Sequence, residues 1–365
     1  MDGILKKWRT YNEKKVFSIL VLAIFLISAV GCTNSTKEVS KENKETIHLN
    51  IGYAPGIGNM LCFIAQDKGF FKEENLEIEL IPFTNSSDGL NALNSGKLDI
   101  GISFGTAAPL TFITNGADFS FFGGYLSGGH PIYAKKEVAD KYKGIKDFKG
   151  KKVATPRLYT PDIVWRSAMN KAGINIKSDL ELIEMKKPTD VLEAVKSGKA
   201  DIGIGTGSTY AKAKQAGLEI IEWSNNLWND HVCCRPVAKT DFIEKNPKAI
   251  KKFLKAMIKA EKVWNEEPKF AVKMNEKYLK LDKEMAEEVT LKTNQVIESD
   301  PKRKGIIDMW NRMSEIGYLD HKGINIEDHI NIKMYKEALD EMIKENTNDN
   351  FYKKLEKRYK EYNID

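Results

Sequence analysis

The spacing of apolar and polar positions predicts strands and helices in alternation from residue 47 onward. Period-two alternation between turn residues predicts strands over 47–55, 76–83, 98–104 and 119–125. Apolar residues at helical spacing predict the intervening helices over 59–71, 89–96 and 110–116. Strands that alternate with helices through short connections predict a mainly parallel sheet flanked by helices.

The same order returns after residue 150. Strands are predicted over 151–156, 180–185, 200–205 and 218–223, and helices over 160–174, 191–198 and 209–217. Two such sets predict two α/β lobes. The segments 130–142 and 229–247 resemble each other and are predicted to be extended crossings between the lobes.

One stretch is written almost twice, as SGKLDIGISFGTAAP (95–109) and SGKADIGIGTGST (197–209), at an offset of 102 residues. A helix–turn–strand unit recurs in many α/β proteins, which is one explanation. The other is that each lobe directs a helix N-terminus and its free backbone N–H groups at a shared cleft beyond the strand ends. The matching positions of the two copies in the two lobes favour the second explanation.

The remaining segments complete the predicted organisation. After Pro247 helix follows helix, and the apolar stripe that contains Ile250 and Phe253 indicates core packing. The first lobe is therefore predicted to comprise 47–129 and a helical second part, 231–345. The second lobe with the crossovers is predicted over 130–230, and a loose polar tail over 346–365.

The N-terminus predicts export from the cytoplasm. A basic start precedes the apolar run 16–30, which is shorter than the roughly 20 residues that a spanning helix needs. Because Cys32 follows Ala29-Val30-Gly31, residues 1–31 resemble a bacterial lipoprotein signal peptide, with Cys32 as the lipidated residue. A signal anchor and a plainly secreted protein are the alternatives. The polar stretch 32–46 is predicted to be a flexible tether outside the cell, on the outer face of the membrane.

Composition excludes several classes of function. With 57 Lys+Arg against 51 Asp+Glu, and no basic stripe with interleaved aromatic residues, nothing indicates nucleic-acid binding. Cys62, Cys233 and Cys234 give no disulfide framework, and no His/Cys spacing predicts a metal site. No catalytic motif such as a nucleophile elbow or a Walker loop is present, so we expect a monomeric binding protein without a cofactor rather than an enzyme.

Candidate ligand contacts lie in loops that follow strand ends, where glycine lets a ligand approach the backbone closely and hydroxyl groups can donate. In the first lobe and at its crossing these are Gly56, Asn59, Gly105, Thr106, Ala107 and His130. In the second lobe and at its crossing they are Arg157, Tyr159, Thr160, Thr206, Gly207, Ser208, Trp228 and His231.

Three of these choices have a structural alternative. Arg157 beside a helix N-terminus suits an oxyanion, but it could equally form an ion pair with Asp162 or Glu184. Trp228, in a polar loop, suits stacking on a planar ligand, although aromatic residues usually pack in cores. His231, Cys233 and Arg235 would share one face of an extended segment and could line the cleft, whereas small buried hydrophobes are the favoured interpretation of the cysteines.

The order of several motifs resembles a known family. LNIGYAPG (49–56), DKGFFKEENLEIEL (67–80), the segment 90–125, GIKDFKGKKVATP (144–156) and the segment 314–339 together resemble the solute-binding lipoproteins of ABC importers for nitrate, sulfonate, taurine and thiamine-precursor pyrimidines. The resemblance implies the bilobal periplasmic-binding-protein fold of type II, with two crossovers and a small anionic or planar solute between the lobes.

The resemblance also implies partners. The solute would pass to an ABC permease and its ATPase, and the lipid anchor would keep the receptor beside them. A receptor for a thiamine-precursor pyrimidine or another heterocycle is the alternative within this class. An enzyme of the pyrimidine or menaquinone pathways on the same fold, or a lipoprotein sensor, is the alternative of another class.

Overall fold

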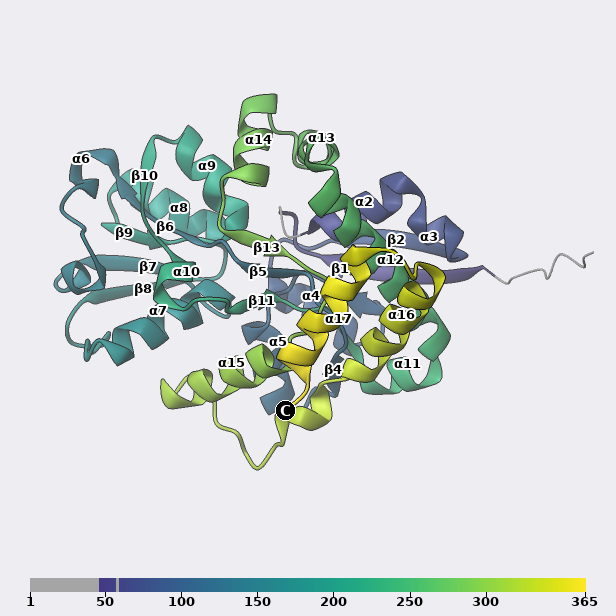
Figure 1. Ribbon diagram of the computed structural model, residues 1–365. Coiled ribbons are helices and arrows are strands. Elements are labelled where there is room, and N and C mark those ends of the chain that lie inside the picture. Colours follow the sequence, from purple (N-terminus) through teal and green to yellow (C-terminus); the bar gives the residue numbers. More distant parts are fainter. Residues whose placement is uncertain (1–45, 57–58) are drawn as a thin grey trace, which may run out of the picture. The chain divides into compact units, whose positions relative to one another are not determined.

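The computed structural model describes residues 46–56 and 59–365 (Figure 1). The predicted signal peptide, the lipidated Cys32 and the tether up to residue 45 lie outside the described residues. Within the described ranges, no helix combines the length and the apolar character that crossing a bilayer requires.

The first lobe is built on a mixed five-stranded sheet of order β2-β1-β3-β12-β4. Its strands are β1 (Ile47–Tyr53), β2 (Leu76–Pro82), β3 (Ile100–Gly101), β4 (Phe119–Phe121) and β12 (Val237–Lys239). Strand β1 pairs in parallel with β2 and β3, whereas β12 returns from the second lobe and pairs antiparallel with β3 and β4. The flanking helices include α2 (Met60–Lys68), α3 (Phe70–Glu73), α4 (Ser86–Asn94) and α5 (Ala107–Thr114).

The second lobe has a sheet of order β10-β6-β9-β7-β8. Its strands are β6 (Pro131–Lys135), β7 (Lys152–Pro156), β8 (Glu181–Met185), β9 (Ile202–Ile204) and β10 (Leu218–Trp223). Strand β7 is parallel to β8 and β9, while β6 is antiparallel to β9 and β10, so this sheet is mixed as well. The helical elements are α6 (Lys136–Ala139), η2 (Ile145–Phe148), α7 (Thr160–Lys171), α8 (Pro188–Ser197), η3 (Gly207–Thr209), α9 (Tyr210–Gln215) and α10 (Ser224–Leu227).

A third, antiparallel sheet joins the lobes. Strand β11 (Val232–Cys234) lies in the predicted crossing 229–247, and it pairs with β5 (Leu126–Gly128), while β13 (Gln295–Ile297) pairs on the other side of β5. Strand β5 precedes the first predicted crossing, 130–142, which instead forms β6 and α6 of the second lobe. Strand β13 follows a helical hairpin of α13 (Pro268–Leu279) and α14 (Lys283–Leu291). Helix α13 contacts α2 of the first lobe, whereas α14 also contacts α9 of the second lobe (Figure 1). The stretch 231–345, which the sequence assigns to the first lobe, therefore also reaches the second.

The duplicated stretch performs the same structural task in both lobes. The carboxylate of Asp99 accepts a hydrogen bond from the Asn50 N–H (2.8 Å), and that of Asp201 accepts one from the Lys152 N–H (2.9 Å). Asn50 and Lys152 themselves stand at the 102-residue offset. Each aspartate therefore fixes its turn to the first strand of its own lobe. The loop that follows the duplicated strand then lies at the corresponding edge of each sheet.

After β12 the chain is helical apart from β13. Helices α11 (Thr240–Lys245), α12 (Pro247–Glu266), α15 (Arg303–Glu315), η4 (Ile326–His329), α16 (Ile332–Glu345) and α17 (Asn350–Asn363) follow β12. As predicted, Ile250, Phe253 and Leu254 of α12 are buried in the core of the first lobe. Asn85 caps α4 by accepting from the Asp88 N–H.

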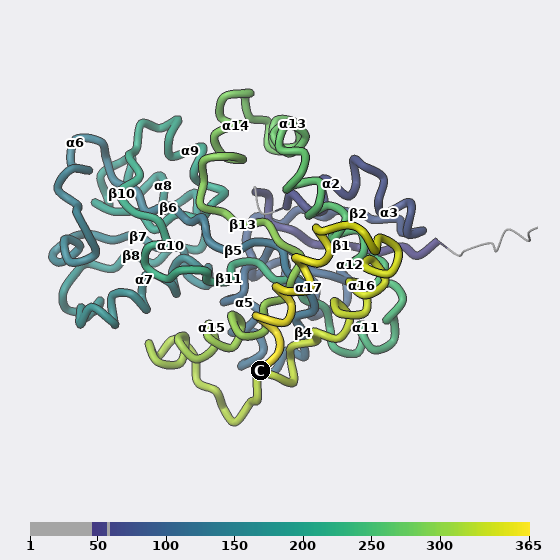
Figure 2. The backbone as a smooth tube through the Cα atoms, viewed as in Figure 1, coloured from purple at the N-terminus to yellow at the C-terminus, as the bar shows by residue number. Residues whose placement is uncertain are grey.

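The polar segment 346–365, expected to be a loose or frayed helix, is helical but is packed rather than loose. Tyr352, Leu355 and Tyr359 form a buried stripe on α17, which packs against α16 (Figure 2). The Arg358 guanidinium pairs with the buried Glu261 carboxylate at 2.7 Å. These apolar positions have helical spacing, but the many lysines between them conceal it in the sequence.

Candidate functional site

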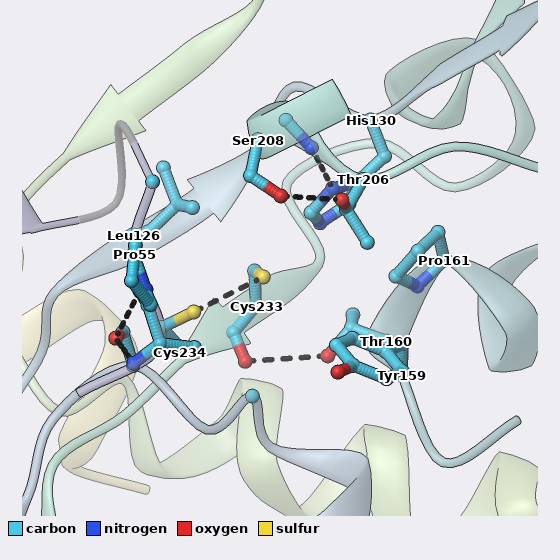
Figure 3. Close-up of a pocket in the computed structure, with 15 residues that line it drawn as sticks. Pro55, Leu126, His130, Tyr159, Thr160, Pro161, Thr206, Ser208, Cys233 and Cys234 are labelled. Carbon is cyan, nitrogen blue, oxygen red and sulfur yellow. Dashed lines mark hydrogen bonds between the residues drawn. The ribbon is translucent and has the colours of Figure 1, made fainter. Parts of the chain in front are cut away.

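A small cavity lies where loops of both lobes meet the third sheet, β11-β5-β13, which joins the lobes (Figure 3). The centres of water molecules can occupy about 70 Å³ of it. The first lobe contributes Ala54, Pro55, Gly56, Ser103 and Gly105. The second lobe contributes Tyr159, Thr160, Pro161, Thr206, Gly207 and Ser208. The crossing segments contribute Leu126, His130, Cys233 and Cys234.

The structure brings eight of the predicted contact residues to this cavity: Gly56, Gly105, His130, Tyr159, Thr160, Thr206, Gly207 and Ser208. Six others do not line it: Asn59, Thr106, Ala107, Arg157, Trp228 and His231. That the eight bind a ligand remains a prediction.

Two of the six support the cavity wall from behind. The Thr106 hydroxyl donates to the Cys233 carbonyl at 2.6 Å, and the Thr160 hydroxyl donates to the same oxygen at 3.3 Å. The first and second lobes thus hold strand β11 through one carbonyl. The Asn59 amide donates to the Ala54 and Gly56 carbonyls and shapes the loop after β1. Ala107 is buried among apolar residues at the start of α5.

Arg157 forms one of the two ion pairs that the sequence offers as alternatives to binding an oxyanion. Its guanidinium forms an ion pair with Glu184 at 2.7 Å and lies 4.9 Å above the centre of the Tyr318 ring, outside the cavity. The chain turns at Leu158, which has a positive φ of 70°. Arg157 consequently lies with Glu184, while Tyr159 and Thr160 on the other side of the turn reach the cavity. Arg157 instead lines a separate pocket with Glu184 and Tyr318, and a contact between Arg157 and an oxyanion stays a prediction.

Trp228 and His231 pack behind the cavity. The indole of Trp228 lies 3.9 Å from the guanidinium of Arg312 and belongs to a core cluster. The His231 Nδ1 donates to the Trp228 carbonyl at 2.6 Å, which leaves its Nε2 unprotonated in the neutral form. Burial lowers the pKa of His231 to about 4, so the neutral ring is the form present at neutral pH.

His130 lines the cavity and carries a buried hydrogen-bond donor. Its Nδ1 accepts from the Gly207 N–H at 3.2 Å, so the proton of the neutral ring lies on Nε2. Burial and, second, the neighbouring His231 hold the pKa of His130 well below its usual value. Its Nε2 is fully buried and has no hydrogen-bond partner among the residues that the structure describes. An unpaired buried donor costs free energy, which a ligand acceptor would recover.

The second lobe adds hydroxyl groups and a close contact. The hydroxyls of Thr206 and Ser208 lie 2.8 Å apart, and because only one of them donates to the other, one proton is free for a ligand. Ser208 also touches the opposite lobe, since a Cβ built on Gly56 would lie 2.7 Å from the Ser208 Cβ. Glycine at position 56 therefore allows the lobes to meet.

Five lining residues were missed: Ala54, Pro55, Ser103, Leu126 and Pro161. Two of them, Pro55 and Pro161, are neighbours in sequence of predicted residues, and that adjacency was the available signal. The Ser103 hydroxyl bonds both the N–H and the C=O of Ala54, which ties the ends of β1 and β3 together. The cysteines are buried, as favoured from sequence, but they also line the cavity.

No Lys, Arg, Asp or Glu stands among the described residues that line this cavity. The wall consists instead of backbone groups and of hydroxyl, thiol, imidazole and apolar side chains. The site is therefore suited to an uncharged partner more than to a bare anion.

The chain matches known proteins over most of its length. The model of the NMT1-like family matches residues 42–277. A binding protein of Brucella abortus is 26% identical over 280 residues, covering 74% of this chain and 80% of its own. The 4-amino-5-hydroxymethyl-2-methylpyrimidine phosphate synthase of Candida albicans is 28% identical over 241 residues, with 60% and 66% covered. The formylaminopyrimidine-binding protein of Halalkalibacterium halodurans is 23% identical over 210 residues, with 56% and 60% covered.

Solved structures share the fold at low sequence identity. The ligand-binding component of an ABC-type import system from Staphylococcus aureus matches with a TM-score of 0.69 at 17% identity, covering 80% of this chain and 99% of that one. The periplasmic aliphatic sulphonate binding protein of Escherichia coli matches with a TM-score of 0.64 at 19% identity, covering 80% and 100%. The chain belongs to the NMT1-like family and has the periplasmic-binding-protein fold that its sequence predicts.

Proposed function

We propose that this chain is the extracytoplasmic solute-binding component of an ABC importer and that its solute is a small, uncharged, planar heterocycle. The observation that carries the choice of solute is the lining of the interlobe cavity, which holds hydrogen-bonding groups and no charged side chain. Receptor function is supported by the family match, by the binding protein of Brucella abortus and by the import component from Staphylococcus aureus.

The polar groups of the cavity suit ring nitrogens and carbonyl oxygens. The Nε2–H of His130 and the free hydroxyl proton of the Thr206–Ser208 pair are donors that a heterocycle can satisfy. Leu126, Pro55 and Pro161 provide apolar surface for the faces of a flat ring. A relative named for a ligand of this class is the formylaminopyrimidine-binding protein of Halalkalibacterium halodurans.

A sulfonate or nitrate is the second candidate solute. It is supported by the fold shared with the sulphonate binding protein of Escherichia coli. Burying a small anion without a cation requires several backbone donors in its place, because the desolvation cost of a charge is large. Arg157, the cation proposed for this purpose from sequence, is paired with Glu184 outside the cavity.

The remaining parts of the proposal concern partners. The solute would pass to a permease and its ATPase, and a lipid on Cys32 would hold the receptor, a monomer, on the outer face of the membrane. The signal-like N-terminus supports this placement. The synthase of Candida albicans, which shares the family resemblance, keeps a cytoplasmic enzyme as the alternative. A sensor that reports solute to a membrane partner is the other alternative.

A thermal-shift panel tests the choice of solute. The full chain is heated with uncharged pyrimidines in one arm, and with taurine, an alkanesulfonate or nitrate in the other. A solute at 100 times its Kd adds about 2.7 kcal/mol to the free energy of unfolding, so the melting temperature should rise in the pyrimidine arm. His130→Ala should abolish the rise, whereas Arg157→Ala, as the matched control, should retain it.

The opposite pattern would overturn the heterocycle proposal. Stabilisation confined to the anion arm, and lost in Arg157→Ala, would show that the guanidinium leaves Glu184 to bind the solute. Release of a chemically altered product after incubation would favour the enzyme.

A further inference from the structure

Two adjacent cysteines point their sulfur atoms at each other in the wall of the solute cavity. Side chains of consecutive strand residues normally point to opposite faces of a sheet. The pairing of β11 with β5 shifts register between Val232 and Cys234, and such a bulge re-aims side chains. As a result the Sγ atoms of Cys233 and Cys234 lie 3.4 Å apart, and both residues line the cavity (Figure 3).

The hydrogen bonds of the pair favour a thiolate on Cys234 over one on Cys233. The hydrogen bond between the Cys233 and Cys234 thiols and a bond from the Gly105 N–H lower the pKa of Cys234 despite full burial. Burial raises the pKa of Cys233, which keeps that thiol protonated as the donor. The thiolate is the nucleophilic and ligating form of cysteine, so Cys234 is the first sulfur to react.

The pair is also disfavoured from forming a disulfide. Adjacent Cα atoms are about 3.8 Å apart across a trans peptide, below the usual 4.4–6.8 Å of disulfide-linked residues, so a ring between them is strained and easily reduced. Cys62, the other cysteine in the described ranges, is buried in the first lobe with its sulfur 3.8 Å from that of Met257. The two sulfurs therefore persist as a dithiol.

The surroundings indicate what such a dithiol can hold. Residues 46–56 and 59–365 contain no group of three or more His, Cys, Asp or Glu side chains arranged for a metal ion. A trivalent arsenic atom that carries one organic group needs only two sulfur ligands, because the organic group occupies its third position. The uncharged lining of the cavity offers room for that group beside the sulfurs.

We infer that Cys233 and Cys234 form a dithiol site for monosubstituted trivalent arsenicals within the interlobe cavity. With phenylarsine oxide the reaction forms two As–S bonds and breaks the As–O double bond. The two thiol protons leave with the oxygen as one water molecule, and arsenic stays trivalent. No oxidant or reductant takes part.

The test uses the full, reduced chain and phenylarsine oxide, read by intact-protein mass spectrometry in excess glutathione. Glutathione removes arsenic from single thiols such as Cys62, whereas a pair of thiols holds it. We expect a 1:1 adduct that a small dithiol, 2,3-dimercaptopropanol, removes. Cys233→Ser and Cys234→Ser should each weaken capture roughly 10²- to 10⁴-fold, because the second bond is intramolecular in the wild type. Cys62→Ser is the matched control and should capture normally.

Digestion of the wild-type adduct keeps the inference testable even if a serine variant fails to fold. The arsenical should be recovered on the peptide that contains both Cys233 and Cys234. An adduct on another peptide, or capture that is unchanged in Cys233→Ser, would overturn the site. Neither result bears on solute transport, since the thermal-shift panel tests that separately.

Discussion

Gly56→Ala tests whether closure of the two lobes requires the close approach of Gly56 to Ser208. Gly56 follows β1 of the first lobe, and the Cβ added by alanine would meet the Ser208 Cβ of the second lobe at 2.7 Å. The φ angle of Gly56 is not positive, so alanine suits the backbone and the contact alone is at issue.

The size of the effect follows from this contact. Ordinary contacts of a Cβ begin near 3.4 Å, so the lobes must separate by about 0.7 Å or distort locally. Overpacking of this kind costs about 1–3 kcal/mol. Because only the closed state contains the contact, the whole cost falls on closure. Solute affinity should therefore decrease by roughly 5- to 150-fold.

The assay is isothermal titration with the solute that the thermal-shift panel identifies, together with small-angle scattering of the free and bound protein. The melting temperature of the solute-free variant should change little. Ser208→Gly removes the opposing Cβ, so the double variant Gly56→Ala/Ser208→Gly should recover affinity relative to Gly56→Ala. The single variant Ser208→Gly supplies the fourth corner of the cycle.

Two results would refute the reasoning. Wild-type affinity in Gly56→Ala would mean that the bound state does not have this contact. The affinity loss of the double variant could instead equal the product of the losses in the two single variants. That result would mean that alanine acts through the loop after β1 and not through Ser208.

Three further predictions concern the framework around the cavity. Arg235→Met should lower the free energy of unfolding by about 3–5 kcal/mol in urea titrations, since it removes a buried guanidinium that donates to several buried acceptors and leaves the Glu298 carboxylate, 2.9 Å away, with Lys302 as its remaining cation. A loss no larger than that of an exposed Lys or Arg variant would contradict this. Because the folded-state pKa of His231 is depressed from 6.5 to about 4, the unfolded chain binds the extra proton, and stability should fall by up to about 3 kcal/mol as the pH drops from 6.5 toward 4; His231→Gln should flatten that slope. Tyr318→Phe removes the acceptor of the Leu158 N–H (2.7 Å), a hydrogen bond that contributes about 0.5–1.5 kcal/mol. Without this bond the solute should be released faster in stopped-flow traces, and an unchanged release rate would contradict the prediction.

Local patterns in the sequence predict the strands, the loops after them and thereby most of the cavity wall. Gly105 and Thr206 could be placed because a buried strand and a helix start bracket each of them. The duplicated aspartates act within their own lobes, so their short-range pairing was accessible to the pattern.

Features that depend on distant partners could not be predicted. The sequence names Glu184 as one possible partner of Arg157, but the choice depends on the pairing of β7 with β8, which brings the two residues together across 27 positions. The bulge in β11 exists through its pairing with β5, more than a hundred residues earlier, so the approach of the two sulfurs has no local signal. The burial of α17 likewise depends on Glu261 and on α16.

The third strand between the lobes limits how they can move. A ribbon of three paired strands bends about a line that crosses all of them, but it resists shear and torsion more than two strands would. The α13–α14 hairpin adds a second link, through the Tyr210 hydroxyl that donates to Glu288 at 2.5 Å. Closure of the lobes around a solute then follows nearly one direction of motion. Because the open receptor has few other conformations, closure costs little conformational entropy.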